Sequence, residues 1–85
     1  MKLTEEDINA KIADIKYDRI RGTTTTLCIL TLQNGFVVVG KSACVDPDEF
    51  DSAMGESIAL DDAVSKVWEL EGYLLAQHIY EEANK

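Results

Sequence analysis

Hydrophobic and β-favouring residues are concentrated near the middle of the chain, in residues 24–41, TTTLCILTLQNGFVVVGK. An Asn-Gly pair between two such runs is typical of a two-residue turn of type I′, because both residues tolerate the positive φ that this turn requires. The pattern therefore predicts a β-hairpin closed at Asn34 and Gly35. The turn sets the expected register: Gln33 opposite Phe36, Leu32 opposite Val37, Leu30 opposite Val39 and Cys28 opposite Lys41.

This register divides the hairpin into two apolar faces, because side chains alternate across a strand. The expected core face comprises Cys28, Leu30, Leu32, Val37 and Val39. The second face is still too apolar to be left in water. We interpret it as a candidate interaction surface, formed by Leu27, Ile29, Phe36 and Val38. A second copy of the chain would cover it, or alternatively an N-terminal helix through Ile8 and Ile12.

The N-terminal segment begins with a helix signal. Thr4 precedes three acidic residues, and a threonine cap with acidic side chains in the first turn favours a helix over about Glu5 to Ala13. Residues 15–20 then alternate between apolar and polar side chains, which is typical of a half-buried strand. We expect this segment to form a third, edge strand beside the hairpin.

The C-terminal half is predicted to be helical. Asp46 and Pro47 form a helix start, Gly55 is expected to end this first piece, and Ser57 is expected to cap a long helix reaching Ala83. Residues 57–83 would span ~40 Å, whereas an eight-residue strand spans ~27 Å, so one end of the helix should overhang the sheet. An apolar stripe runs along it through Leu60, Ala63, Val67, Leu70 and Leu74, widened by Val64, Trp68, Leu75 and Ile79.

These elements predict an α+β fold in one domain, residues 1–85, with the hairpin packed against the long C-terminal helix. The expected core contains Leu30, Leu32, Val37 and Val39 from the hairpin and Val67, Leu70 and Leu74 from the helix. A chain of 85 residues is too short to bury all of its apolar surface, which includes the second hairpin face, the wide helix stripe and the overhang of the helix. We therefore expect a homo-oligomer, most simply a two-fold dimer.

The net charge of −8 argues against a nucleic-acid-binding protein, because such proteins cluster Lys and Arg. The basic residues that do gather are Lys11, Lys16, Arg19 and Arg21. No charged and apolar leader pattern is present, and no apolar run approaches the ~18 residues that a membrane span needs. We expect a soluble protein with no membrane partner.

Little in the sequence points to catalysis or metal binding. Two cysteines without CxxC spacing and one histidine do not make a zinc site, so we expect Cys28 and Cys44 to be free thiols in a reducing cytoplasm. The acidic run after residue 45 fails the calcium-loop pattern, because Phe50 stands where a ligand is needed. We expect no cofactor and no enzymatic activity. Gly72 is expected to mark a helix bend or a close backbone approach.

The chain resembles a family of small phage and prophage proteins, the N-four gp-forty-nine and Sf-six gp-sixty-six family. The resemblance lies in residues 25–28, 32–36, 40–47, 50–51, 55, 58–59, 63, 66–68 and 70–75, which include Gln33-Asn34-Gly35, Cys44-Val45-Asp46-Pro47 and Glu71-Gly72-Tyr73. It implies a phage-encoded protein acting in the cytoplasm of an infected bacterium. It implies no catalytic residues.

Two functions of different classes follow. The first is a small acidic interaction protein that binds a host or phage protein during infection. The alternative is a binder of a small ligand such as a signalling nucleotide, with a pocket at a subunit interface near Arg19, Arg21, Trp68 and Tyr73. An acidic mimic of DNA rests on net charge alone and ranks last.

Overall fold

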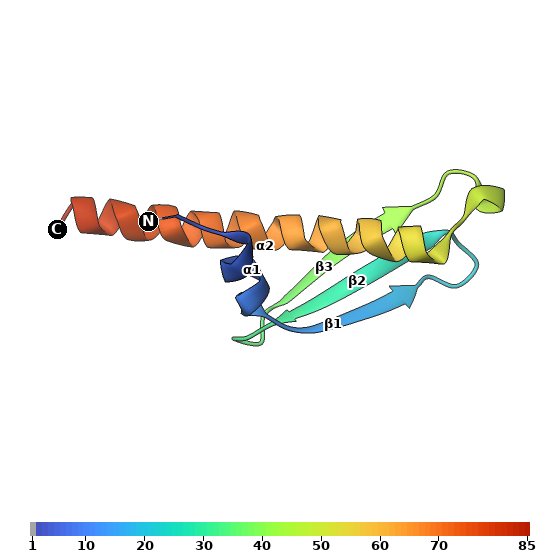
Figure 1. Ribbon diagram of the computed structural model, residues 1–85, viewed down its shortest axis with the longest axis horizontal. Helices are drawn as coiled ribbons and strands as arrows, with labels where there is room; N and C mark the ends of the chain where they lie inside the picture. The colour runs from blue at the N-terminus through green and yellow to red at the C-terminus, as the bar shows by residue number, and fades with distance from the viewer. Residues whose placement is uncertain (1) are drawn as a thin grey trace.

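The computed structural model describes residues 2–85. Its elements follow the order α1 (Glu5–Lys11), β1 (Ile12–Arg19), β2 (Thr25–Leu32), β3 (Val37–Ala43), a 3₁₀ turn η1 (Pro47–Glu49) and α2 (Ser52–Ala83). The strands form one antiparallel sheet in the order β1-β2-β3. The long helix α2 lies across β2 and β3, and α1 packs beside it near the start of β1 (Figure 1). The predicted α+β fold and its third strand are confirmed.

Helix α1 is shorter than predicted, and β1 begins earlier. Thr4 and Asp7 form a reciprocal capping box, in which the side chain of each accepts a hydrogen bond from the backbone N–H of the other. At the other end Ile12 is already extended, so the chain passes from helix to strand without a loop. The register of β1 against β2 shifts between Ile12 and Asp14, which marks a β-bulge. Ile8 is the one residue of α1 that is fully buried.

The predicted hairpin is present, but its turn type and its register differ from the prediction. Leu32 pairs with Phe36, and the loop between them has three residues, Gln33 to Gly35. Gly35 has a φ of 88°, while no non-glycine residue within 2–85 has a positive φ, so Asn34 cannot be part of a type I′ turn. The N–H of Gly35 donates to the carbonyl of Leu32 at 2.9 Å. This is a turn closed by a left-handed glycine, the usual three-residue hairpin loop.

The longer loop moves β3 by one residue against β2. Leu30 lies opposite Val38 rather than Val39, and Cys28 lies opposite Gly40 rather than Lys41. A shift of one residue exchanges the two faces of a strand. Val38 is therefore buried under α2 with an exposure of 5%, whereas Val37 and Val39 are 50% and 41% exposed. The predicted assignment of the β3 residues to the two faces was wrong, and that of the β2 residues to the core was right.

Helix α2 is continuous from Ser52, five residues before the predicted start. Asp51 caps it by accepting hydrogen bonds from the backbone N–H groups of Ala53 and Met54. Gly55 does not end a helix but lies within α2, where a Cβ would approach the hydroxyl of Thr26 to 2.9 Å. Gly55 thus allows the first turn of α2 to pack closely on β2. The predicted capping role of Asp46 is confirmed in η1, where its side chain accepts from the N–H of Asp48.

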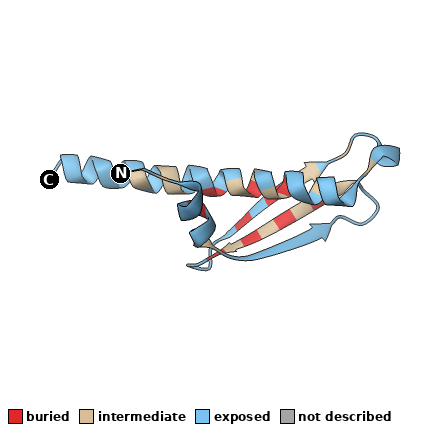
Figure 2. Cartoon of the chain, in the orientation of Figure 1, coloured by how far each residue is buried: buried red, intermediate tan, exposed pale blue. Residues whose placement is uncertain are grey.

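The core lies between the sheet and the first half of α2 (Figure 2). The buried residues are Ile8, Cys28, Leu30, Leu32, Val38, Ala59, Ala63 and Val67, together with the polar residue Thr26. The expected core positions Leu70 and Leu74 are instead 40% and 59% exposed. A helix of 32 residues is ~48 Å long and outruns strands of seven or eight residues, which confirms the predicted overhang.

Candidate functional site

The predicted interaction surface does not form one patch. Leu27 and Ile29 point to the outer face of the sheet and are partly buried there. Val38 points to the opposite face and is buried beneath α2. Phe36 also lies on the helix side, in a groove with residues of α2. The prediction failed because it depended on the two-residue turn, which the structure replaces with a three-residue loop.

A different apolar surface lies at the tip of the hairpin. Here Phe36 faces α2 across a groove of about 190 Å³, which Leu32, Asn34, Phe36, Leu70, Glu71, Tyr73 and Leu74 line. We call the exposed apolar residues of this region, Phe36, Leu70, Tyr73 and Leu74, the tip surface. They are 55%, 40%, 69% and 59% exposed. Ile79 and Tyr80 continue the exposed apolar side chains along the overhanging part of α2.

The residues proposed for a ligand pocket are spread over the chain. Arg19 lies at the opposite end of the sheet from the tip surface, where its guanidinium stacks 4.0 Å above the ring of Phe50. Its neighbours there include Tyr17, Thr26 and Glu56. Tyr73 lies in the groove at the hairpin tip, seventeen helical residues from Glu56, or ~26 Å along α2. One chain therefore does not bring Arg19 and Tyr73 together, and Trp68 and Arg21 line neither place.

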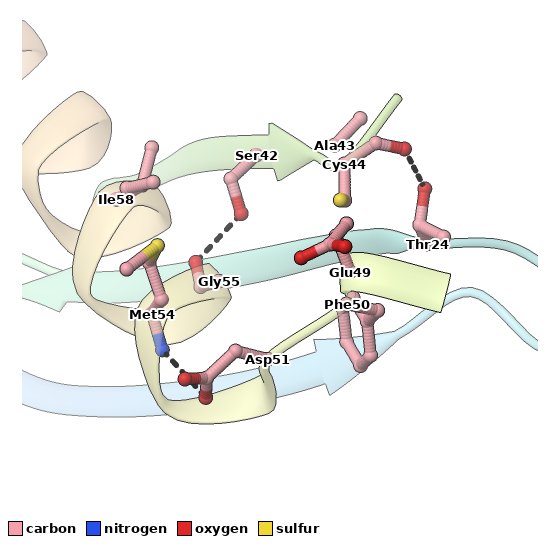
Figure 3. A pocket seen from close by; sticks show the side chains of 10 residues that line it. All are labelled: Thr24, Ser42, Ala43, Cys44, Glu49, Phe50, Asp51, Met54, Gly55 and Ile58. Carbon is pink, nitrogen blue, oxygen red and sulfur yellow. Dashed lines mark hydrogen bonds between the residues drawn. The ribbon is translucent and has the colours of Figure 1, made fainter. Parts of the chain in front are cut away.

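A second hollow lies between the end of the sheet and the start of α2 (Figure 3). Its volume is about 180 Å³, and its lining is mainly apolar. Hydrogen bonds within the chain occupy both of its hydroxyl groups: Ser42 Oγ donates to the carbonyl of Gly55 at 2.6 Å, and Thr24 Oγ1 donates to that of Cys44 at 2.5 Å. This volume is below the ~300 Å³ at which small-molecule pockets usually begin. The hollow therefore serves to join α2 to the sheet.

The two cysteines are free and differ in surroundings. Cys28 is fully buried in the core, and burial raises the pKa of its thiol. Cys44 is partly exposed at the hollow, where its Sγ donates to the carbonyl of Asp46 at 3.0 Å. Partial burial also raises the pKa of Tyr17, and the nearby Cys28 and Glu56 add to this effect. Within residues 2–85, no cluster of three or more His, Cys, Asp or Glu side chains could hold a metal ion.

Sequence reasoning missed two side chains that close one edge of the sheet. Asp62 Oδ2 accepts the outward N–H of Lys41 at 2.9 Å, and Lys66 Nζ donates to the outward carbonyl of Val39 at 2.6 Å. Asp62 and Lys66 also pair with each other at 3.7 Å. Their spacing of four residues is that of a helical ion pair, which by itself gave no sign of contact with a strand. Side chains of α2 thus satisfy two of the backbone groups that β3 turns outward, the N–H of Lys41 and the carbonyl of Val39.

None of the helices in the described chain is long and apolar enough to cross a membrane. Comparisons with curated proteins and with solved structures found no match. A family model, in contrast, matches residues 3–79, which is nearly the whole chain, and confirms the resemblance drawn from the sequence. The chain belongs to the Phage protein (N4 Gp49/phage Sf6 gene 66) family.

Proposed function

We propose that this phage-encoded protein acts by binding another protein in the cytoplasm of the infected bacterium, and that the tip surface makes the contact. The observation that carries this proposal is the exposure of four large apolar side chains around one groove, with Tyr73 and Leu74 the most exposed. Aromatic and aliphatic side chains gathered in this way are typical of the centre of protein interfaces. The partner is a host or phage protein.

The charge of the chain supports a protein partner over a nucleic acid. The net charge is −8, and the groove at the tip surface contains the carboxylate of Glu71 and no Lys or Arg. Phosphate groups would be repelled there, whereas an apolar segment flanked by basic residues on a partner would complement the groove. The only histidine, His78, is exposed on the overhang of α2. We infer a binding role without chemical turnover.

The experiment that tests this proposal is photocrosslinking during infection. A crosslinking phenylalanine derivative replaces Tyr73 in one variant and Ser65 in the control. Both positions are exposed on α2, but Ser65 lies on the side away from the sheet. We expect a defined heterologous adduct from position 73 only, and we expect Leu74→Glu to abolish it while circular dichroism shows an intact fold. Equal adducts from both positions, or adducts with the chain itself alone, would reject the tip surface as the contact.

The small-ligand alternative has less support, because Arg19 and Tyr73 lie far apart within one chain and such a pocket would need a second subunit to complete it. What favours it is Arg19 itself, whose stacking on Phe50 shows that a flat cation and an aromatic ring are available at one place. A thermal-shift assay with cyclic and linear nucleotides tests it. A rise in melting temperature that Arg19→Ala abolishes would move the proposal from a protein partner to a nucleotide. No rise with any nucleotide would exclude the alternative.

A further inference from the structure

The two edges of the sheet are treated differently by the rest of the chain. On β3, the side chains of Asp62 and Lys66 satisfy outward backbone groups at Lys41 and Val39. On β1, the other edge, every residue after Ile12 is exposed. An open edge of this length is a template for pairing with another strand. β1 is therefore the edge that is available for pairing with another strand.

The backbone groups that face the open edge can be assigned from one hydrogen bond. The N–H of Ile20 donates to the carbonyl of Thr25, so the backbone of Ile20 points toward β2. Because this direction alternates along an antiparallel strand, the backbone groups of Ile15, Tyr17 and Arg19 point outward. Within one chain the N–H of Arg19 donates to its neighbour Asp18 at 2.9 Å. Within the described chain, no helix or loop supplies a hydrogen-bond acceptor for the N–H groups of Ile15 and Tyr17.

We propose that a second copy of the chain pairs with this edge, with the two β1 strands antiparallel and Tyr17 opposite Tyr17 on the two-fold axis. The result is one continuous six-stranded sheet. The charges on β1 favour a second copy of the chain as the partner. Asp14, Lys16 and Asp18 share the outer face of β1 in the order minus, plus, minus. A two-fold axis at Tyr17 sets Lys16 of each copy opposite Asp18 of the other, which joins opposite charges twice.

Neighbouring registers are less favourable. An axis at Lys16 would place Lys16 opposite itself and Asp14 opposite Asp18, so that only like charges meet. An axis at Ile15 would again pair opposite charges, Asp14 with Lys16. That register, however, extends the pairing across the bulge between Ile12 and Asp14, where the strand no longer presents a regular edge. The register centred on Tyr17 uses residues 14–20 and avoids the bulge.

The helix side of β1 supports the same arrangement. Ile15 and Tyr17 point to that side, opposite Leu30 and Cys28, but α2 lies over β2 and β3 and leaves them 43% and 40% exposed. In the proposed dimer the two Tyr17 rings meet across the axis, and each Ile15 lies opposite Arg19 of the other copy. Surface that one chain leaves open is thereby covered. The edge shares no residue with the tip surface, so this proposal does not rest on the proposed function.

The first test uses proline, which lacks the N–H that edge pairing needs. Tyr17→Pro removes an outward N–H from β1, and the matched control Val39→Pro removes one from β3, the edge on which α2 already binds the carbonyl of Val39 and the N–H of Lys41. Light scattering after gel filtration measures the mass. We expect twice the chain mass of 9.4 kDa for the unmodified protein and for Val39→Pro, and 9.4 kDa for Tyr17→Pro. The proposal is overturned if the unmodified protein is monomeric at roughly 100 µM, a concentration at which even a weak specific complex would form.

The second test exchanges charges and does not alter the backbone. Lys16→Asp places like charges opposite each other at both pairs, so the dissociation constant of the dimer should rise by about tenfold or more. Adding Asp18→Lys to the same chain restores opposite charges in the register centred on Tyr17 and should return the constant to within about threefold of the original. Weaker dimerisation that the second change does not restore rejects this register. A dimer that both proline and charge variants leave intact rejects the edge, and dissociation by Ile29→Lys would then assign the outer face of the sheet.

Discussion

Gly40 of β3 lies directly against Ala63 of α2: a Cβ on Gly40 would stand 2.3 Å from the backbone nitrogen of Ala63 and equally near the carbonyl oxygen of Ala59. These are backbone atoms of a helix and cannot move aside as a flexible side chain can. The missing side chain of Gly40 and the small side chains of Ala59 and Ala63 therefore set how closely α2 approaches the sheet.

Gly40→Ala should lower the free energy of unfolding by about 2 kcal/mol or more, because a Cβ at that position overpacks the contact between α2 and β3. Urea denaturation followed by circular dichroism measures the change. The matched control is Gly72→Ala on α2, where nothing lies within 4 Å of the position of a Cβ. The control should stabilise by ~1 kcal/mol through helix propensity. Of the two roles predicted for Gly72, a helix bend or a close backbone approach, the open space around it contradicts the close approach. Similar effects of the two substitutions would contradict the packing described here.

Leu30→Ala should destabilise the fold by ~2–5 kcal/mol, because Leu30 is fully buried at the centre of the core and its loss leaves a cavity. Leu74→Ala is the comparison, since Leu74 was predicted to share that core but is 59% exposed. Its effect on stability should stay within ~0.5 kcal/mol. Thermal or urea unfolding of both variants checks the core assignment. A large loss of stability in Leu74→Ala would show that Leu74 belongs to the core after all.

Replacing Asp62 with Ala should cost about 1 kcal/mol, because the N–H of Lys41 loses its acceptor at the edge of β3. It should also open that edge to pairing with other chains. Unfolding gives the stability, and light scattering over a concentration series gives the association. Asp61→Ala is the control, since its neighbour Asp62 makes the contact with the strand. An equal response from both carboxylates would mean that the general loss of negative charge is responsible.

Cys44 should react with a thiol reagent much faster than Cys28 in the folded protein, because Cys28 is fully buried and Cys44 is partly exposed. A colorimetric thiol reagent should therefore find one rapid thiol in the native chain and two in denaturant without reductant. Cys44→Ser should remove the rapid phase and leave the slow one. Two rapid thiols in the native state would show that the core around Cys28 opens readily, and none in denaturant would show a disulfide.

The stability of the fold should decline at alkaline pH. Burial raises the pKa of Cys28 in the folded chain above its ordinary value of 9.0, so the unfolded chain releases this proton first. The unfolded state then binds fewer protons than the folded state, and the free energy of unfolding falls as the pH rises above about 9. Urea denaturation between pH 7 and pH 10, at roughly one-unit steps around that value, measures the slope. Cys28→Ala should reduce the slope, and Tyr17→Phe separates the contribution of the neighbouring tyrosine, whose pKa is also raised.

Features that depend on a few neighbouring residues were predictable from the sequence alone. The cap at Thr4, the cap at Asp46 with Pro47 in the first position, the existence of the hairpin and the length of α2 relative to the strands all follow from local chemistry. So did the placement of Leu30 and Leu32 in the core, because alternation along a single strand needs no partner. The α+β class follows from these elements together.

The faces of β3 were decided by the tertiary structure. Asn34-Gly35 is compatible with a two-residue turn, in which both residues have positive φ, and with a three-residue loop, in which only the glycine does. These loops differ by one residue, and that residue exchanges the faces of β3. The two-residue turn would have pointed Val39 and Lys41 at α2, whereas the observed loop points Val38 and Gly40 there and leaves Lys41 at the surface. Close packing of a helix and the cost of burying an amine select the second, and neither can be evaluated before α2 is placed on the sheet.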